Sequence, residues 1–332
     1  MSFTYTTNVH FAKPSDGDTD HGDEIRQNFD VVDHALAPDS TYFVSPNFTS
    51  SNMANTSSTN RRHWDTIQGA IDRINALGNS TAADPYTILV YPGGYAENLT
   101  FSTSVHIVGV GGKMNSLSRS NGATPRLTGS ATSANSLITV TPPTSQSVAV
   151  NFTNFYFENL YAVSNSTEIT NPYLLDFQDT GTGGTPHYFG MTDCQARMQT
   201  WGDDNNWTWG VKTRGRVITS LMNSDFISLS HGGGEDTGGV IRMFDWQGDG
   251  SYKAEMWIDS CSIEAWSLVP AAIEYLFYRD NGTNGRISRS SWYSPSHLRV
   301  NGSSTGDNDF AGLYPEIPGE DYGNIIFQTV RF

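Results

Sequence analysis

Short segments in which apolar and polar residues alternate recur through most of the chain, and a small polar turn interrupts each of them once. Alternation places every second side chain on one face of a strand, so each segment predicts two short strands joined at the turn. The turns include Asp193-Cys194, Asn223-Ser224-Asp225, Asp259-Ser260-Cys261 and Ser290-Ser291. The segments with this pattern are Val148 to Val163, His187 to Met198, Arg216 to Ser228, Ala254 to Trp266 and Gly285 to Tyr293.

These segments are predicted to be successive coils of a parallel β-helix, with a loose period of 25 to 40 residues. One such coil cannot cover its own apolar face, whereas the coils above and below it can. The fold class is therefore all-β, a single-stranded parallel β-helix. A final strand is predicted over Asn324 to Phe332 to close the stack.

A helix from Thr66 to Leu77 is predicted to cap the open end of this stack. Asp65 is expected as its N-cap, Gln68 follows three positions later, and Gly78 is expected to end it. One face of the helix is apolar and the other polar, as a lid between core and water requires. Short strands without an intervening helix follow, from Tyr86 to Gly109.

The chain is divided into an extended N-terminal arm, residues 1–60, and a β-helix domain, residues 61–332. A short helix from Asp23 to Ala37 is expected within the arm, and an apolar stripe runs along one side of it. This stripe is the candidate for attachment to another protein or to a sister subunit, although packing on its own β-helix is an equal alternative. Its members are Ile25, Phe29, Val32 and Leu36.

Composition narrows the classes of partner. The net charge is −15, from 34 acidic and 19 basic residues, and binding to nucleic acid requires clustered basic side chains. No apolar run approaches the roughly 20 residues that cross a bilayer, and the first residues do not have the pattern of a signal peptide. We therefore expect neither nucleic acid nor membrane as a partner, and no secretion. Cys194 and Cys261 are expected as reduced, packed thiols.

Two motifs resemble the opening of pectin methylesterases and other pectin-lyase-like β-helix proteins. They are Trp64-Asp65-Thr66-Ile67-Gln68-Gly69-Ala70-Ile71-Asp72 and Ile88-Leu89-Val90-Tyr91-Pro92-Gly93-Gly94-Tyr95-Ala96-Glu97-Asn98. The resemblance covers residues 62–112 and implies that the β-helix is right-handed. It identifies a scaffold rather than a reaction, because many relatives that share the pattern of Gly93, Tyr95 and Glu97 are not enzymes.

Only one of the esterase family's catalytic segments has a counterpart here, Gln178-Asp179-Thr180. If the chain were an enzyme, the resemblance would assign Gln178 and Asp179 to its active site. The aspartate nucleophile and the substrate-orienting arginine of the family have no counterpart, so the acyl transfer lacks an attacking group. The expectation is therefore that the protein is not an enzyme. A pectin methylesterase-like esterase or a polysaccharide depolymerase remains the alternative.

The segment from Gly17 to Asp33 resembles one found near the start of tail fibres, spikes and other virion proteins of bacteriophages. This resemblance implies a head decoration, tail fibre or tailspike that assembles in the host cytoplasm, often as a homotrimer, and binds capsid or tail proteins. The first hypothesis is accordingly a non-enzymatic structural protein of the virion, with a host-surface glycan as a further candidate partner.

A loop with several tryptophans and carboxylates is the candidate glycan-binding site. Flat aromatic faces stack on sugar rings, and carboxylates and amides bind sugar hydroxyls. Packing of the same loop on the stack or on a neighbouring subunit is the alternative. Its residues are Trp201, Asp203, Asp204, Trp207 and Trp209. No segment has the spacing of a calcium loop, and no metal or cofactor is predicted.

Overall fold

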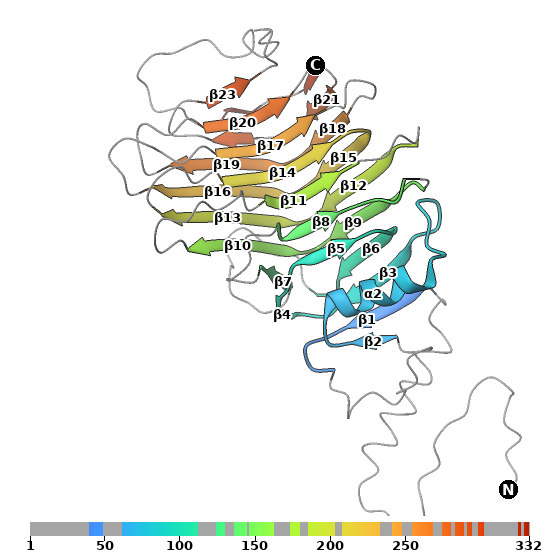
Figure 1. The fold of residues 1–332 in the computed structure, drawn as a ribbon. Helices are drawn as coiled ribbons and strands as arrows, with labels where there is room; N and C mark the ends of the chain where they lie inside the picture. Colours follow the sequence, from blue (N-terminus) through green and yellow to red (C-terminus); the bar gives the residue numbers. More distant parts are fainter. Residues whose placement is uncertain are drawn as a thin grey trace, which may run out of the picture.

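The computed structural model describes residues 40–48, 62–111, 124–129, 136–144, 146–162, 173–179, 185–202, 208–232, 241–247, 254–267, 274–279, 283–288, 291–293, 298–301, 325–326 and 329–331. These residues form three sheets and one helix, α2 (Ile67–Leu77). The strands are stacked as successive coils, and α2 lies beside the first of them (Figure 1). The predicted all-β, right-handed parallel β-helix is confirmed.

From β3 to β23, each coil contributes one strand to each of the three sheets. Sheet A has the order β2 (His63–Trp64), β1 (Thr41–Val44), β3 (Tyr86–Val90), β6 (Val105–Gly109), β9 (Ala149–Thr153), β12 (His187–Thr192), β15 (Val217–Met222), β18 (Ala254–Asp259), β21 (Thr283–Ser288), β25 (Thr329–Arg331). Sheet B has the order β24 (Ile325–Ile326), β22 (Ser291–Tyr293), β19 (Ser262–Ser267), β16 (Asp225–Gly232), β13 (Gln195–Gly202), β10 (Tyr156–Ala162), β7 (Pro125–Thr128), β4 (Gly93–Ala96). Sheet C has the order β23 (Leu298–Asn301), β20 (Glu274–Arg279), β17 (Ile241–Gln247), β14 (Thr208–Arg214), β11 (Tyr173–Gln178), β8 (Ile138–Val140), β5 (Leu99–Phe101).

The chain visits the three sheets in a constant order, A, then B, then C. From β3 to β20 each strand therefore pairs in parallel with the strand three positions later, as β9 does with β12 and β10 with β13. Neighbouring coils are separated by the strand spacing of about 4.8 Å. All five strand-turn-strand segments predicted from the sequence form consecutive strands of sheets A and B.

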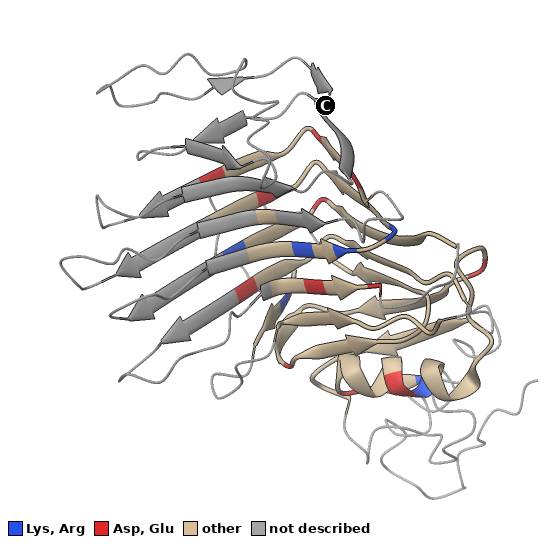
Figure 2. Ribbon diagram, turned by 45° about the horizontal axis from the view of Figure 1, so that its top comes forward, with Lys and Arg blue, Asp and Glu red and all other residues tan. Residues whose placement is uncertain are grey.

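Apolar side chains from all three sheets fill the interior of the stack. Phe152 lies at the centre of an aromatic cluster and is 1% exposed. Its ring is 5.2 to 6.3 Å, centroid to centroid, from four others: Phe101, Phe155, Phe157 and Phe189. Three of these contacts are edge-to-face, the geometry that aromatic quadrupoles favour. Charged residues are scattered along the described coils, with most of the ribbon formed by uncharged residues (Figure 2).

The turn between sheets A and B contains one residue in the left-handed conformation in each of four consecutive coils. These residues are Asn154, Asp193, Asn223 and Ser260, with φ between 49° and 58°. Asn and Asp tolerate this conformation better than most residues, and a single left-handed residue turns the chain sharply between two strands. The small polar turns predicted from the sequence therefore stack on one another along the edge of the β-helix.

The residue after each of these turns faces the interior, which places the two cysteines in one column with Ser224 between them. The hydroxyl of Ser224 accepts a hydrogen bond from the Cys194 N–H at 3.1 Å, and Ser224 O accepts one from the Ser262 N–H at 3.0 Å. Cys194 and Cys261 are thus two coils, or about 9.6 Å, apart. A disulfide requires Cα atoms within about 7 Å, so the predicted free, packed thiols are confirmed.

Both thiols are expected to be unreactive in the native protein. Burial raises the pKa of Cys194 and of Cys261 to about 12, which leaves little thiolate at neutral pH. A colorimetric disulfide reagent at pH 8 should therefore label neither thiol until denaturant is added, and then label both. A Ser102→Cys variant, at an exposed position, is the control that should react at once. Native labelling of the wild type at the rate of the control would contradict the buried column.

Helix α2 matches the predicted segment, but its N-cap is Thr66 rather than Asp65. Thr66 is extended (φ −127°, ψ 146°), and its side chain accepts a hydrogen bond from the Gly69 N–H at 3.3 Å. The predicted N-cap was one residue too early, because helical backbone geometry begins one residue later than the sequence indicated. Gly78 ends the helix in the left-handed conformation, as predicted (φ 67°).

The Gly93, Tyr95 and Glu97 pattern has a structural purpose in this chain. The Glu97 carboxylate accepts hydrogen bonds from the N–H groups of Ile67 (3.0 Å) and Gln68 (2.8 Å), at the start of α2. The Tyr95 hydroxyl donates to Tyr91 O at 2.8 Å. Burial raises the pKa of Glu97, although the two N–H groups oppose that shift. The motif therefore attaches the capping helix to the first coil.

The two ends of the stack differ in part from the prediction. Strand β1 belongs to sheet A, where it pairs with β3, although it lies in the segment assigned to the arm. The division at residue 60 itself stays a prediction. At the other end, two short strands replace the single closing strand that was predicted. β24 pairs antiparallel with β22, and β25 pairs antiparallel with β21. Within the described ranges, no helix is long and apolar enough to cross a membrane.

Candidate functional site

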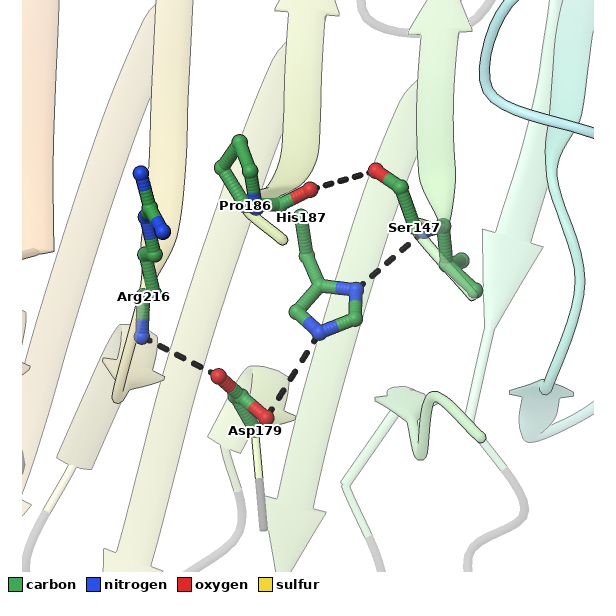
Figure 3. Close-up of polar contacts among 6 residues, drawn as sticks. Ser147, Asp179, Pro186, His187 and Arg216 are labelled. Carbon is green, nitrogen blue, oxygen red and sulfur yellow. Dashed lines mark hydrogen bonds and ion pairs between the residues drawn. The ribbon is translucent and has the colours of Figure 1, made fainter. Parts of the chain in front are cut away.

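The one esterase-like segment lies in a buried polar cluster where sheet C leads into sheet A. We call it the Asp179 cluster, and it consists of Ser147, Asp179, Pro186, His187 and Arg216 (Figure 3). Asp179 directly follows β11, His187 begins β12, Ser147 precedes β9 and Arg216 precedes β15. The cluster therefore joins three successive coils at the same corner of the β-helix.

The carboxylate of Asp179 is enclosed by this corner. Its side chain is 2% exposed, Oδ1 lies 3.5 Å from His187 Nε2, and Oδ2 accepts a hydrogen bond from the Arg216 N–H at 3.3 Å. The backbone N–H of Asp179 donates to Arg214 O in the next coil at 2.9 Å. A catalytic carboxylate must reach a substrate, whereas these contacts direct Asp179 into the protein. Asp179 therefore accepts hydrogen bonds that link neighbouring coils.

The next coil approaches Asp179 closely because residue 215 is glycine. Gly215 has φ +83°, a conformation that L side chains rarely adopt. A Cβ at this position would lie 2.8 Å from Asp179 Cβ and 3.0 Å from Asp179 O. Only two residues, Gly215 and Arg216, connect β14 to β15, so this tight corner is what places the Arg216 N–H against the carboxylate.

His187 has both ring nitrogens engaged. Nδ1 accepts a hydrogen bond from the Val148 N–H at 3.2 Å, so this nitrogen carries no proton. The proton of the neutral ring is then on Nε2, which faces Asp179. Burial lowers the pKa of His187, and Asp179 offsets only part of that shift. The ring is therefore a neutral bridge between the coil of β9 and Asp179.

Ser147, His187 and Asp179 together do not form a nucleophilic triad. The Ser147 hydroxyl donates to Pro186 O rather than to the imidazole. The lone pair that a general base would use, on Nδ1, is occupied by the Val148 N–H. Catalysis by a triad requires the nucleophile to hydrogen-bond to the base. The contacts of the Asp179 cluster therefore favour a structural role.

Stability is expected to fall as the pH is lowered through the histidine range, partly because of His187. A folded-state pKa below the usual value means that the unfolded chain takes up a proton first, as the pH drops below about 6.5. The loss approaches about 1.4 kcal/mol per pH unit for one such group. Denaturant unfolding between pH 7.5 and 5 should show a shallower decline for His187→Gln than for the wild type. Parallel declines in the two proteins would contradict the assignment.

Gln178 is placed on the outside of sheet C. Its side-chain amide donates to both carboxylate oxygens of Asp176, at 3.0 and 2.9 Å. Asp176 lies opposite Lys212 on β14, and Lys212 lies opposite Asp245 on β17. Opposite charges on adjacent strands stabilise a sheet, so this row also has a structural explanation. The structure thus separates Gln178 from the buried carboxylate of Asp179.

The other predicted site residues are placed only in part. Trp201 lies on β13 opposite Ala162 and His231, and Trp209 lies on β14 opposite Tyr173 and Arg242. Asp203, Asp204 and Trp207 lie outside the described residues, as do Ile25, Phe29, Val32 and Leu36. The glycan-binding loop and the attachment stripe stay predictions. In the described ranges, no group of three or more His, Cys, Asp or Glu residues is arranged to hold a metal ion.

Three residues of the Asp179 cluster were not predicted from the sequence: Ser147, His187 and Arg216. One feature of the sequence could have indicated His187: it is the first residue of β12, and Asp179 is the first residue of the loop that leads to β12. The other two lie one coil away in the chain, and loops of unequal length separate the coils. No sequence spacing therefore indicates that they meet at one corner.

Comparison with known proteins gives fold neighbours only. No protein-family model and no curated protein matches the sequence. Two structures of the pectin methylesterase from Aspergillus niger, in deglycosylated and penultimately deglycosylated forms, are similar to this chain. Each is 16% identical, and the alignments cover 82% of this chain and 89% of the enzyme, with TM-scores of 0.33 and 0.35.

Proposed function

We propose that the protein is a non-enzymatic structural component of a bacteriophage virion, a head decoration, fibre or spike-like protein built on a β-helical rod. The observation that carries the non-enzymatic part is the Asp179 cluster. The Asp179 carboxylate accepts a hydrogen bond from the Arg216 N–H and faces His187 Nε2, and the side chain is 2% exposed. A residue so placed stiffens the stack, and stiffness is what a projecting structural protein requires.

The virion part of the proposal is supported by the similarity of the segment from Gly17 to Asp33 to virion proteins. In this proposal the N-terminal arm attaches the β-helix to capsid or tail proteins, and the chain assembles as a homotrimer in the host cytoplasm. The apolar stripe of Ile25, Phe29, Val32 and Leu36 makes the attachment. Burial of such a stripe against a partner is favourable by about 25 cal/mol per Å² of apolar surface.

Density-gradient purification of phage particles from a culture that produces the protein tests this proposal. Peptides of this chain should be found by mass spectrometry in the particle band, in fixed proportion to the capsid protein. A Phe29→Asp variant should be lost from the particle, whereas Asp30→Asn, off the stripe, should be retained. Circular dichroism should show that both variants keep the β-helix. Absence of the wild-type chain from the band would refute the virion role.

A further inference from the structure

Three neighbouring strands of sheet A carry exposed apolar side chains on their outer face. Tyr188 on β12, Met222 on β15 and Trp257 on β18 are 39%, 45% and 42% exposed. Among the residues whose side-chain exposure the structure describes, the other large hydrophobic residues with similar exposure are Leu77, at the end of α2, and Tyr91, which follows β3. Because β12, β15 and β18 are consecutive in the sheet, the three side chains lie on one outer face, in three successive rows of the register.

Strand register places two small residues, Gly190 and Ser220, in one row with the ring of Trp257. Gly190 lies opposite Ser220, and Ser220 lies opposite Trp257, so these three residues form one row across the strands. Tyr188 is two residues before Gly190 and therefore points to the same side. We call the set Tyr188, Gly190, Ser220, Met222 and Trp257 the aromatic face. Ile218, which lies opposite Tyr188 and Glu255, shares this face, so the small residues Gly190 and Ser220 lie on the Trp257 side of the gap between the two rings and Ile218 on the Tyr188 side.

A polar group lies at the end of this row opposite Trp257. Asn151 on β9 is paired with Gly190, and its Oδ1 lies 2.3 Å from where a Cβ of residue 190 would be. The amide of Asn151 therefore occupies the space above Gly190. Any larger residue at position 190 would displace this amide. Glycine here leaves room for the amide, which places a polar group on the outer face beside the row.

The two rings are separated by a distance that suits an extended ligand. Tyr188 and Trp257 are two coils and two residues apart, which corresponds to about 12 Å between their Cα atoms. Flat aromatic rings with polar groups nearby recognise molecules that have one apolar and one polar face. A pyranose ring has this character, with its C–H groups on one face and hydroxyls around its edge. Two rings at this separation fit a short stretch of a sugar chain.

The charges around the aromatic face indicate which sugars fit. Glu255 and Asp259 lie two residues before and after Trp257 on β18, on the same side of the strand. Arg286 lies opposite Trp257 on β21, so two acidic residues and one basic residue neighbour Trp257 and the local balance is acidic. Carboxylates accept hydrogen bonds from sugar hydroxyls and repel acidic sugars. The chain as a whole has a net charge of −15, which also disfavours uronic acids and sulfated glycans. The fitting ligand is therefore a neutral sugar chain.

A second copy of the protein fits this face poorly. Large side chains bury about 150 to 250 Å² each, so three of them at roughly 40% exposure present about 250 Å². A stable protein interface buries about 800 Å² on each partner. The aromatic face therefore offers a surface sized for a small ligand.

We infer that the aromatic face of sheet A binds a neutral carbohydrate chain. Tyr188 and Trp257 stack on its sugar rings. The polar residues nearby form hydrogen bonds with the sugar hydroxyls; they are Asn151, Ser220, Glu255 and Asp259. This site is distinct from the tryptophan-containing loop that the sequence indicated. It does not depend on the virion role, because binding is a property of the isolated chain.

Isothermal titration of the purified full chain with cellohexaose, maltohexaose and hexagalacturonate tests the inference. At least one neutral hexaose should bind saturably, and hexagalacturonate should not. Trp257→Ala and Tyr188→Ala should each weaken binding at least tenfold, whereas Trp257→Phe, which keeps a flat ring, should retain most of it. Tyr91→Ala removes an equally exposed ring elsewhere and is the matched control that should bind like the wild type.

Two results would overturn the inference. One is the absence of saturable binding by both neutral hexaoses at millimolar concentration. The other is an affinity for the neutral hexaoses that is the same in Trp257→Ala, Tyr188→Ala, the Tyr91→Ala control and the wild type. Sedimentation of the wild type and Trp257→Ala adds a separate readout, since a change in oligomeric state on substitution would assign the face to a second copy of the chain. A failure of the particle experiment would leave all of these results intact.

Discussion

Replacing Phe152 with alanine is expected to lower the free energy of unfolding by about 3–5 kcal/mol, the usual loss for a fully buried phenylalanine. Its ring lies beside four other phenylalanines, one from each of the three sheets and Phe155 from a turn, and is 1% exposed. Neighbouring coils are held by hydrogen-bonded strands, so they cannot collapse into the space that the ring leaves. The cost therefore includes a cavity as well as lost burial.

Denaturant unfolding followed by circular dichroism measures this loss. Tyr188→Ala is the control, because it also removes an aromatic ring from sheet A but from its exposed face. That control should change stability by less than about 1 kcal/mol. Equal losses in Phe152→Ala and Tyr188→Ala would show that the interior of the stack is not close-packed around Phe152.

Replacing Asp179 with alanine is expected to lower the free energy of unfolding by about 2–5 kcal/mol, since it leaves two buried donors without this acceptor. These are the Nε2–H of His187 and the N–H of Arg216. Asp179→Asn should lose about half as much, because one amide oxygen can still accept while the NH₂ group faces the other donor. Thermal or denaturant unfolding should show that stability decreases from the wild type to Asp179→Asn and then to Asp179→Ala.

The same variants separate a structural Asp179 from a catalytic one. A catalytic carboxylate would make Asp179→Asn a stable protein that has lost turnover, whereas a structural one makes it less stable with no activity to lose. Release of methanol from methyl-esterified pectin, or of reducing ends from polysaccharide, is the readout. Turnover by the wild type that Asp179→Asn abolishes at unchanged stability would reverse our conclusion and favour the esterase alternative.

Much of the fold was predictable because each coil repeats the same local requirements. Alternating side chains, a small polar turn at Asn223 or Ser260 and a capped amphipathic helix are all visible in short stretches of sequence. The N-cap was assigned one residue too early, since Asp65 and Thr66 both suit that position and the choice depends on where the helix geometry begins. Glu97 was recognised as part of a pattern, but its contact with α2 spans about 30 residues.

The candidate sites were less predictable, because residues that are neighbours on a β-helix lie one coil apart in the chain. The connection from β11 to β12 runs from Asp179 to Pro186, whereas the next one is only Gly215 and Arg216. Such unequal loops remove any fixed spacing by which Asp179 and Arg216 could be matched. Tyr188 and Trp257 are separated by 69 positions (257 − 188), and only the strand register shows that they share one face.

The sequence by itself determined the class of this protein: short strands, sharp polar turns and a capping helix, because these depend on side-chain alternation and on conformational preferences within a few residues. The tertiary structure alone decided what the polar and aromatic residues do. It turned Asp179 inward against His187, and it placed Tyr188 and Trp257 outward on one sheet. The physical reason is that stacking sets neighbours by register between coils, and register depends on loop lengths and packing over the whole stack.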